Sequence, residues 1–284
     1  MQKTKLSFSL ATGLLAAAAL TGCGGSGGGS DDSYTPPALQ NGPGGTLLGF
    51  YAESQDANDP NAEVGGIYVD APKDEGRIKG RASFRYFDCQ GNNSNNLTID
   101  GTKLTSYLSG TIEGTLDSVS SSNKNNKKVL LAFDKLSYSR AEDRYTGGYV
   151  LDQDNNDTRT VPNCNSVPDN GQFVLARKGS ITLYPADTVF PNDFKVDVNA
   201  TGNLISWSGA PSSARKALID VINPSAIGNS SANGIVYQTV STSVLPTALV
   251  PNDAVTDNTN YMVVVQLFDA NNQPVAFKQV TAKF

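Results

Sequence analysis

A regular alternation of residue types between Arg77 and Tyr86 constrains the fold of this chain more than any other stretch. Apolar or small residues alternate there with mostly basic ones: Ile78, Gly80, Ala82, Phe84 and Tyr86 against Arg77, Lys79, Arg81, Ser83 and Arg85. Successive side chains of a β-strand point to opposite faces. The segment therefore predicts a strand with one face in a core and the other in water.

Comparable segments recur through residues 46–184 and predict one all-β domain. They cover residues 46–51, 66–69, 104–116, 127–138, 144–151 and 172–184. In the run 104–116, Gly110 and Gly114 share a face with the leucines, as expected where a strand bends around a corner. Seven or eight antiparallel strands with no helical period between them favour a β-barrel or a β-sandwich. The sequence leaves both open.

Residues 185–284 predict a second β domain of about seven short strands, the number of an immunoglobulin-like sandwich. Phe194, Val196 and Val198 alternate, and apolar runs follow at residues 204–207, 217–222, 235–239, 261–268 and 275–284. The region resembles a fibronectin type III domain, which buries a tryptophan on its second strand, where Trp207 stands. The resemblance implies that Tyr261 is the tyrosine-corner residue, hydrogen-bonded to the preceding loop. It implies a spacer or binding module and carries no catalytic residue.

The first 23 residues have the layout of a secretory signal. Lys3 and Lys5 precede an apolar run over residues 10–20, which is about half the ~20 residues that a membrane-spanning helix needs. The segment ends in Leu20-Thr21-Gly22-Cys23, which resembles the lipobox of bacterial lipoproteins. The resemblance implies that residues 1–22 are a cleaved signal peptide and that Cys23 carries acyl chains such as palmitate. An ordinary cleaved signal peptide is the alternative.

Gly24 follows the cysteine, where the inner-membrane retention signal of lipoproteins places an aspartate. By the same resemblance, we expect a lipid anchor in the outer membrane, with the surface or periplasmic side left open.

Residues 23–45 are rich in Gly, Ser and Pro and predict a tether. The tether contains a Gly-x-Ser-x-Gly pattern at residues 24–28. A nucleophile elbow needs a strand before and a helix after its serine, so we do not interpret the pattern as catalytic.

The charge balance limits the partners. The chain has 22 basic and 27 acidic residues, and removal of residues 1–22 takes away two lysines, which leaves a net charge of about −7. An acidic body argues against nucleic acid as a partner, because nucleic acid requires a basic surface. We therefore expect the lipid to provide the membrane attachment, and the partner to be another envelope protein or an anionic glycan.

Two cysteines remain besides Cys23. Cys89 follows the alternating strand and Cys164 lies in a proline-bounded loop. Export places the pair where disulfides persist, so we predict a Cys89–Cys164 bridge. Closing a loop of about 75 residues restricts the unfolded chain by roughly 4 to 5 kcal/mol in the chain-entropy model.

The absence of histidine argues against most enzymatic mechanisms, because it removes the commonest general base and metal ligand. We therefore predict that the protein is not an enzyme.

The best metal candidate is a calcium loop in which Asp152, Asp154 and Asn156 hold the first, third and fifth positions. Its sixth and twelfth positions are Asp157 and Asn163, which depart from the motif, so a plain polar turn is the alternative and no other cofactor is expected.

The basic residues Arg77, Lys79, Arg81 and Arg85 should project from one strand face. Such a stripe could bind sulfated or phosphorylated glycans. A solvated strand whose charges discourage edge pairing is the alternative.

These observations predict a non-enzymatic outer-membrane lipoprotein that binds a ligand or partner or acts as an envelope scaffold, with surface adhesion as one such role. One alternative is a periplasmic accessory or assembly factor for an envelope or secretion system. The other is a carboxylate-dependent enzyme acting on carbohydrate or lipid. If residues 46–184 form a lipocalin-like barrel, a small apolar ligand in its mouth becomes the leading hypothesis.

Overall fold

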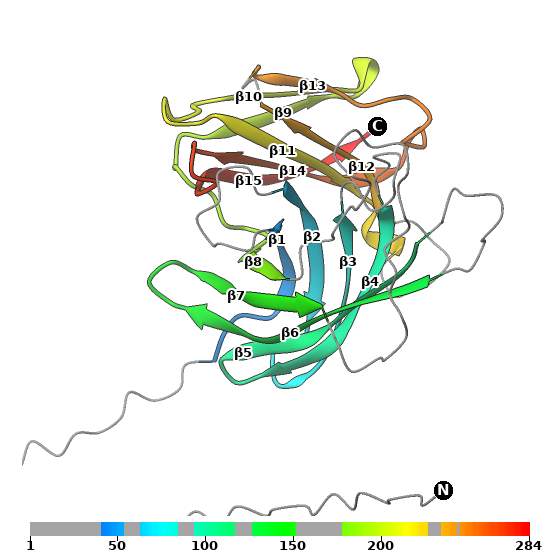
Figure 1. Cartoon of the computed structure of the whole chain (residues 1–284). Coiled ribbons are helices and arrows are strands. Elements are labelled where there is room, and N and C mark those ends of the chain that lie inside the picture. Colours follow the sequence, from blue (N-terminus) through cyan, green and yellow to red (C-terminus); the bar gives the residue numbers. More distant parts are fainter. Residues whose placement is uncertain are drawn as a thin grey trace, which may run out of the picture. The chain divides into compact units, whose positions relative to one another are not determined.

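Eight consecutive strands close into an antiparallel barrel, coloured blue to green in Figure 1. Each strand pairs with its neighbour in sequence, and β8 pairs back onto β1. The all-β prediction is confirmed. Of the two architectures left open for residues 46–184, the structure has the barrel. The strands are β1 (Gly45–Glu53), β2 (Glu63–Ala71), β3 (Gly76–Phe84), β4 (Ser94–Leu104), β5 (Tyr107–Leu116), β6 (Lys127–Ser139), β7 (Arg144–Leu151) and β8 (Lys178–Pro185).

This computed structural model describes residues 41–53, 63–84, 94–116, 127–151, 178–226, 234–242 and 245–284. All of these residues belong to one compact unit, residues 39–284. No helix within the described ranges has the length and apolarity needed to span a membrane.

Strand β4 was not predicted, because a lysine occupies its core-facing row. Leu97 and Ile99 point into the barrel, and Lys103, two positions beyond Gly101, is fully buried. The Lys103 ammonium donates a hydrogen bond to the carbonyl oxygen of Lys73 at 2.9 Å, in the turn between β2 and β3. The run predicted over residues 104–116 is therefore the end of β4, a turn and β5.

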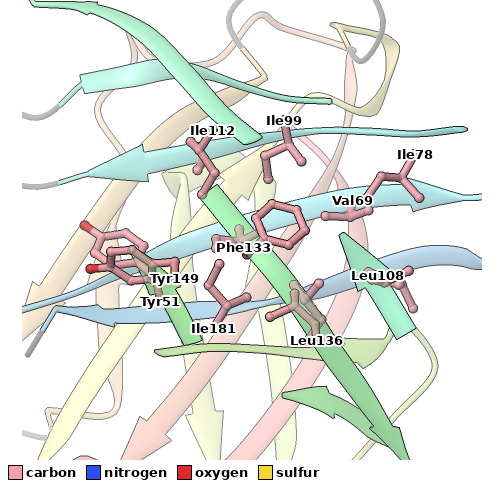
Figure 2. Close-up of a cluster of buried hydrophobic side chains, with 14 of the residues drawn as sticks. Tyr51, Val69, Ile78, Ile99, Leu108, Ile112, Phe133, Leu136, Tyr149 and Ile181 are labelled. Atoms are coloured by element: carbon pink, nitrogen blue, oxygen red, sulfur yellow. The ribbon is translucent and has the colours of Figure 1, made fainter. Parts of the chain in front are cut away.

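Side chains fill the interior of the barrel along its length (Figure 2). Two of the largest are Tyr51 and Tyr149, whose hydroxyl ends point the same way in Figure 2. Each tyrosine lies opposite a glycine on the next strand, Gly65 and Gly179 respectively. A glycine leaves room for an aromatic ring to cover it. The buried cluster comprises Leu47, Tyr51, Ile67, Val69, Ala71, Ile78, Ala82, Leu97, Ile99, Leu108, Ile112, Leu131, Phe133, Leu136, Tyr145, Tyr149, Ile181 and Leu183.

Seven further strands form two antiparallel sheets, referred to below as the C-terminal sheets. A three-stranded sheet has the order β13-β10-β9, and a four-stranded sheet has the order β12-β11-β14-β15. The strands are β9 (Lys195–Asn199), β10 (Leu204–Ser208), β11 (Lys216–Ile222), β12 (Ile235–Ser241), β13 (Thr247–Leu249), β14 (Asn260–Phe268) and β15 (Pro274–Lys283). Two short 3-10 helices, η1 (Ala200–Gly202) and η2 (Pro224–Ala226), lie between strands.

One core joins the two C-terminal sheets. It contains Trp207 of β10, Ile219 of β11 and Val263 of β14. Strand β13 was not among the predicted segments, because it has only three residues and its Leu249 is 65% exposed. Strands β11 and β14 are buried along both faces. One face of each strand lies in this core, so the face that points away from it must pack against another part of the molecule.

The packing around Gly65 generates a stability prediction. A Cβ at this position would lie 2.2 Å from the Tyr51 ring and 2.3 Å from the carbonyl oxygen of Ser83. Gly65→Ala should therefore cost about 2 to 3 kcal/mol of unfolding free energy, which lowers the melting temperature by several degrees. The control is Gly202→Ala, because no atom lies within 4 Å of a Cβ there. Equal melting temperatures for the two variants would contradict the close packing.

Candidate functional site

Most of the predicted site residues lie outside the described residues, so the structure does not test them. These are Cys23, Cys89, Cys164, Arg85, Asp152, Asp154 and Asn156. The described strands do show where their segments start. Because neighbouring strands alternate in direction, β3 and β7 end at the same end of the barrel. The last described residues before Cys89 and Cys164, Phe84 and Leu151, therefore lie at one end of the barrel.

The chain enters the barrel at the opposite end. Residues 41–44 precede β1, and the Gly42 N–H donates to the carbonyl oxygen of Thr105 at 2.9 Å, in the turn between β4 and β5. The Tyr145 hydroxyl donates to the carbonyl oxygen of Pro43 at 2.9 Å. These contacts fix the chain immediately before β1 against the end of the barrel formed by the short turns.

The predicted basic face of β3 is largely neutralised by neighbouring strands. Arg77 is exposed and pairs with Asp100 of β4, with its Nε 2.8 Å from Asp100 Oδ1. This hydrogen bond holds the pKa of Asp100 below its ordinary value. Lys79 lies directly opposite Asp70 on one side and Asp100 on the other. Opposite charges at such cross-strand positions stabilise the sheet, and we do not assign an anionic-glycan site to this face.

Arg81 does not belong to an exposed stripe, because it is only 4% exposed. The alternation correctly placed its side chain outside the barrel, but the C-terminal sheets cover this part of the wall. Its guanidinium donates to the carbonyl oxygen of Ala226 at 3.4 Å. A Cβ at Gly234 would lie 2.6 Å from its side chain. Burial lowers the pKa of this guanidinium.

Arg81 belongs to the junction, the surface at which the outer wall of β1, β2, β3 and β8 packs against the four-stranded sheet. One half of the junction is aromatic. Phe50 and Phe268 meet edge to face with ring centroids 4.8 Å apart, and Tyr184 lies 4.9 Å from Phe277. The apolar cluster comprises Leu48, Phe50, Ala52, Val64, Tyr68 and Tyr184 of the barrel and Leu218, Ile222, Ile235, Met262, Val264, Phe268 and Phe277 of the C-terminal sheets.

The other half of the junction is polar and centres on Asp220 of β11. Gln238 Nε2 donates to Asp220 Oδ1 at 2.7 Å, and Ser83 of the barrel donates to Gln238 Oε1 at 3.2 Å. The Asp220 carboxyl lies directly over Gly66 of β2, where a Cβ would come within 2.3 Å of its Oδ2. A separate hydrogen bond of 3.0 Å runs from Gln266 Nε2 to the carbonyl oxygen of Gly49. Polar contacts of this kind fix the relative position of two packed surfaces.

Burial changes the acid–base behaviour of Asp220. The side chain is 1% exposed, and loss of water raises its pKa to about 7, with the Gln238 hydrogen bond acting in the opposite direction. An unfolded aspartate has a pKa of about 3.9, so between pH 4 and pH 7 the folded state holds a proton that the unfolded state has lost. The contribution of Asp220 to folding therefore becomes less favourable as pH rises through this range, by roughly 4 kcal/mol in total.

Sequence reasoning missed the junction, although β11 and β14 carry a signal for it. Residues 217–222 and 261–268 read as nearly continuous apolar runs, interrupted by Asp220 and Gln266 respectively. Such runs indicate strands covered on both faces. A polar residue inside one indicates a buried hydrogen-bonding partner.

The contact between Asp220 and Gly66 generates a second prediction. Gly66→Ala would push a methyl group into the carboxyl and should cost about 1 to 3 kcal/mol in urea unfolding. Most of that cost should disappear in the Asp220→Ala background, because the atoms nearest to the new methyl group are gone. In the background of Asp197→Ala, an exposed residue of β9, the cost should remain. A cost that is the same in all three backgrounds would show that Asp220 does not press on β2.

No protein-family model matches the chain, and no curated protein matches it. Within the ranges that the structure covers, no group of three acidic, histidine or cysteine side chains is arranged to hold a metal ion.

Proposed function

We propose that this protein is an outer-membrane lipoprotein whose β-strand body binds a partner or acts as an envelope scaffold without catalysing a reaction. The observation that carries the proposal is the lipobox-like Leu20-Thr21-Gly22-Cys23 at the end of a signal-like segment. Acyl chains on Cys23 would contribute about 0.8 kcal/mol per buried methylene to membrane attachment. The acidic body needs such an anchor, because anionic lipid would repel it.

The filled barrel supports binding at the outer surface rather than inside. Eight strands enclose a space that is either packed with side chains or just large enough for one small ligand. Here a continuous set of buried side chains runs from Tyr51 and Tyr149 near one end to Tyr145 at the other. A small apolar ligand in the mouth of the barrel is therefore the less favoured form of the binding hypothesis.

The direction of the strands distinguishes a candidate binding end of the barrel from the end where the chain enters it. Residues 41–44 are fixed at the end of the barrel that carries the short turns. Strands β1, β3, β5 and β7 all end on the opposite side. We therefore propose the end opposite residues 41–44 as the binding end of the barrel.

The C-terminal sheets support a role as an immunoglobulin-like binding or spacing module, resembling fibronectin type III. Seven strands are divided between sheets of three and four. Trp207 is 5% exposed in the core between the sheets. The Tyr261 hydroxyl accepts a hydrogen bond of 2.9 Å from the Thr256 N–H, five residues upstream. This is the contact expected of a tyrosine corner.

Lipidation can be tested in growing cells. Wild-type protein should incorporate an alkyne-labelled palmitate and remain in the membrane fraction after lysis. Cys23→Ala should lose the label and leave that fraction, because the acylated thiol is missing. Ser26→Ala, a matched change in the predicted tether, should behave as wild type. A Cys23→Ala protein that keeps the label would overturn the proposal.

The side of the membrane separates the proposed binding role from that of a periplasmic accessory factor. Protease added to intact cells should cleave a protein displayed at the surface and spare a periplasmic one. Permeabilised cells provide the positive control. If the protease cleaves the protein only after the cells are permeabilised, the protein is periplasmic, and the accessory role is then the better proposal.

The predicted Cys89–Cys164 bridge belongs to the same proposal. The strands that precede the two cysteines in sequence, β3 and β7, end at the same end of the barrel, which supports the pairing. Mass spectrometry of the mature protein under non-reducing conditions should find no free thiol on either residue. Two alkylatable thiols would contradict the bridge.

A further inference from the structure

We infer that the Asp220 carboxyl is a proton-dependent latch between the barrel and the C-terminal sheets, held firmly while protonated and loosened when it ionises. The inference does not depend on the proposed anchor or partner. It rests on three features of the junction: the depth at which Asp220 is buried, the neutral groups around its carboxyl, and the division of the junction into a polar and an aromatic half.

The two groups that the structure places against the carboxyl are uncharged. Gln238 of β12 donates the hydrogen bond that the structure assigns to Asp220, and Gly66 of β2 lies beneath the carboxyl. The residue opposite Asp220 on β14 is Val264. Among the residues the structure describes, no lysine or arginine forms an ion pair with Asp220.

The other titratable side chains of the junction do not replace this missing counter-ion. Arg81 of β3 directs its guanidinium to the carbonyl oxygen of Ala226, and arginine stays charged in proteins. Tyr68 of β2 and Tyr184 of β8 both have their pKa raised by burial, so they remain neutral in the range where Asp220 titrates. Of these four titratable side chains, Asp220 is thus the one whose charge changes between acidic and neutral pH, because its raised pKa lies at about 7.

Ionisation puts a negative charge between two packed surfaces, where Gln238 is the one hydrogen-bond donor to it among the described residues, and this donor is neutral. A buried charge without a partner is costly, and the cost is relieved when water reaches it. Water would reach Asp220 if β12 moved away from β2 and β3, against which it packs, and the Ser83–Gln238 hydrogen bond between β3 and β12 broke. In the aromatic half, none of the four rings, Phe50, Phe268, Tyr184 and Phe277, titrates in this range, so this half should stay closed.

The thermodynamic sign is fixed by the two protonation equilibria. In the closed junction Asp220 has a pKa of about 7, and in a hydrated, open junction it returns toward an ordinary value of about 3.9. Between these values the closed form holds one proton more than the open form. The opening equilibrium constant should therefore rise by up to tenfold per pH unit between pH 4 and pH 7, and become independent of pH above about 8.

Hydrogen exchange of the mature full-length protein, corrected for the intrinsic rate at each pH, tests the latch. In wild type, protection of β12 amides should decrease by up to 100-fold from pH 5 to pH 7, while amides of β14 change much less. Asp220→Asn keeps an acceptor for Gln238 but cannot ionise, so its protection should lack this slope. Asp197→Asn, at an exposed position, should retain the wild-type slope.

Identical pH profiles for wild type and Asp220→Asn would overturn the latch, as would equal changes in β12 and β14. A second measurement needs no variant. The carboxyl carbon-13 resonance of Asp220 in the wild-type protein should titrate with a midpoint near pH 7, and a midpoint near 4 would also overturn the proposal.

Discussion

The burial of the second faces of β11 and β14 is the constraint on which the rest of the structure depends. The side chains of each strand alternate between two environments. One set packs in the core between the C-terminal sheets, and the other set packs against the barrel wall. Exposure of either set would uncover a large apolar surface. Burial of each aliphatic or aromatic side chain stabilises the folded state by about 1.5 to 3 kcal/mol. The barrel and the sheets are therefore parts of one folded body.

Polar groups in this interface restrict how the two parts can pack. An apolar surface alone would tolerate small shifts, whereas the hydrogen bonds of Gln238 and Gln266 require particular partners at particular distances. Gly66 adds a steric requirement, because only a residue without a side chain fits beneath the Asp220 carboxyl. The junction gives up some stability at Asp220 and gains a defined geometry.

Alternating patterns made the strands of the barrel predictable, and the exceptions have physical causes. The face of β3 with Ile78 and Ala82 points inward as expected. Strand β4 escaped prediction because Lys103, on its inward face, donates to a carbonyl oxygen in the turn that precedes the neighbouring strand β3. Arg81 was expected in water because an alternating pattern identifies the two faces of a sheet. It does not show whether another part of the chain covers the outer face.

The candidate site could be predicted only in part for the same reason. The resemblance that placed Tyr261 at a corner concerns contacts within a few residues of sequence, and the hydrogen bond to Thr256 is present. The junction depends on contacts between residues more than a hundred positions apart, such as Ser83 with Gln238. No local pattern encodes such a pairing. The predictions for Cys23, Cys89, Cys164 and the calcium loop concern residues outside the described ranges and stay predictions.

The position of β1 has a mechanical consequence. The chain reaches the body through residues 41–44 and continues directly into β1, which is hydrogen-bonded to β2 on one side and to β8 on the other. A pull on the leading segment along the strand would load both ladders in shear, so that many hydrogen bonds share the force at once. Peeling a strand from an open edge would break them singly. The barrel therefore resists traction at the point where the chain enters it.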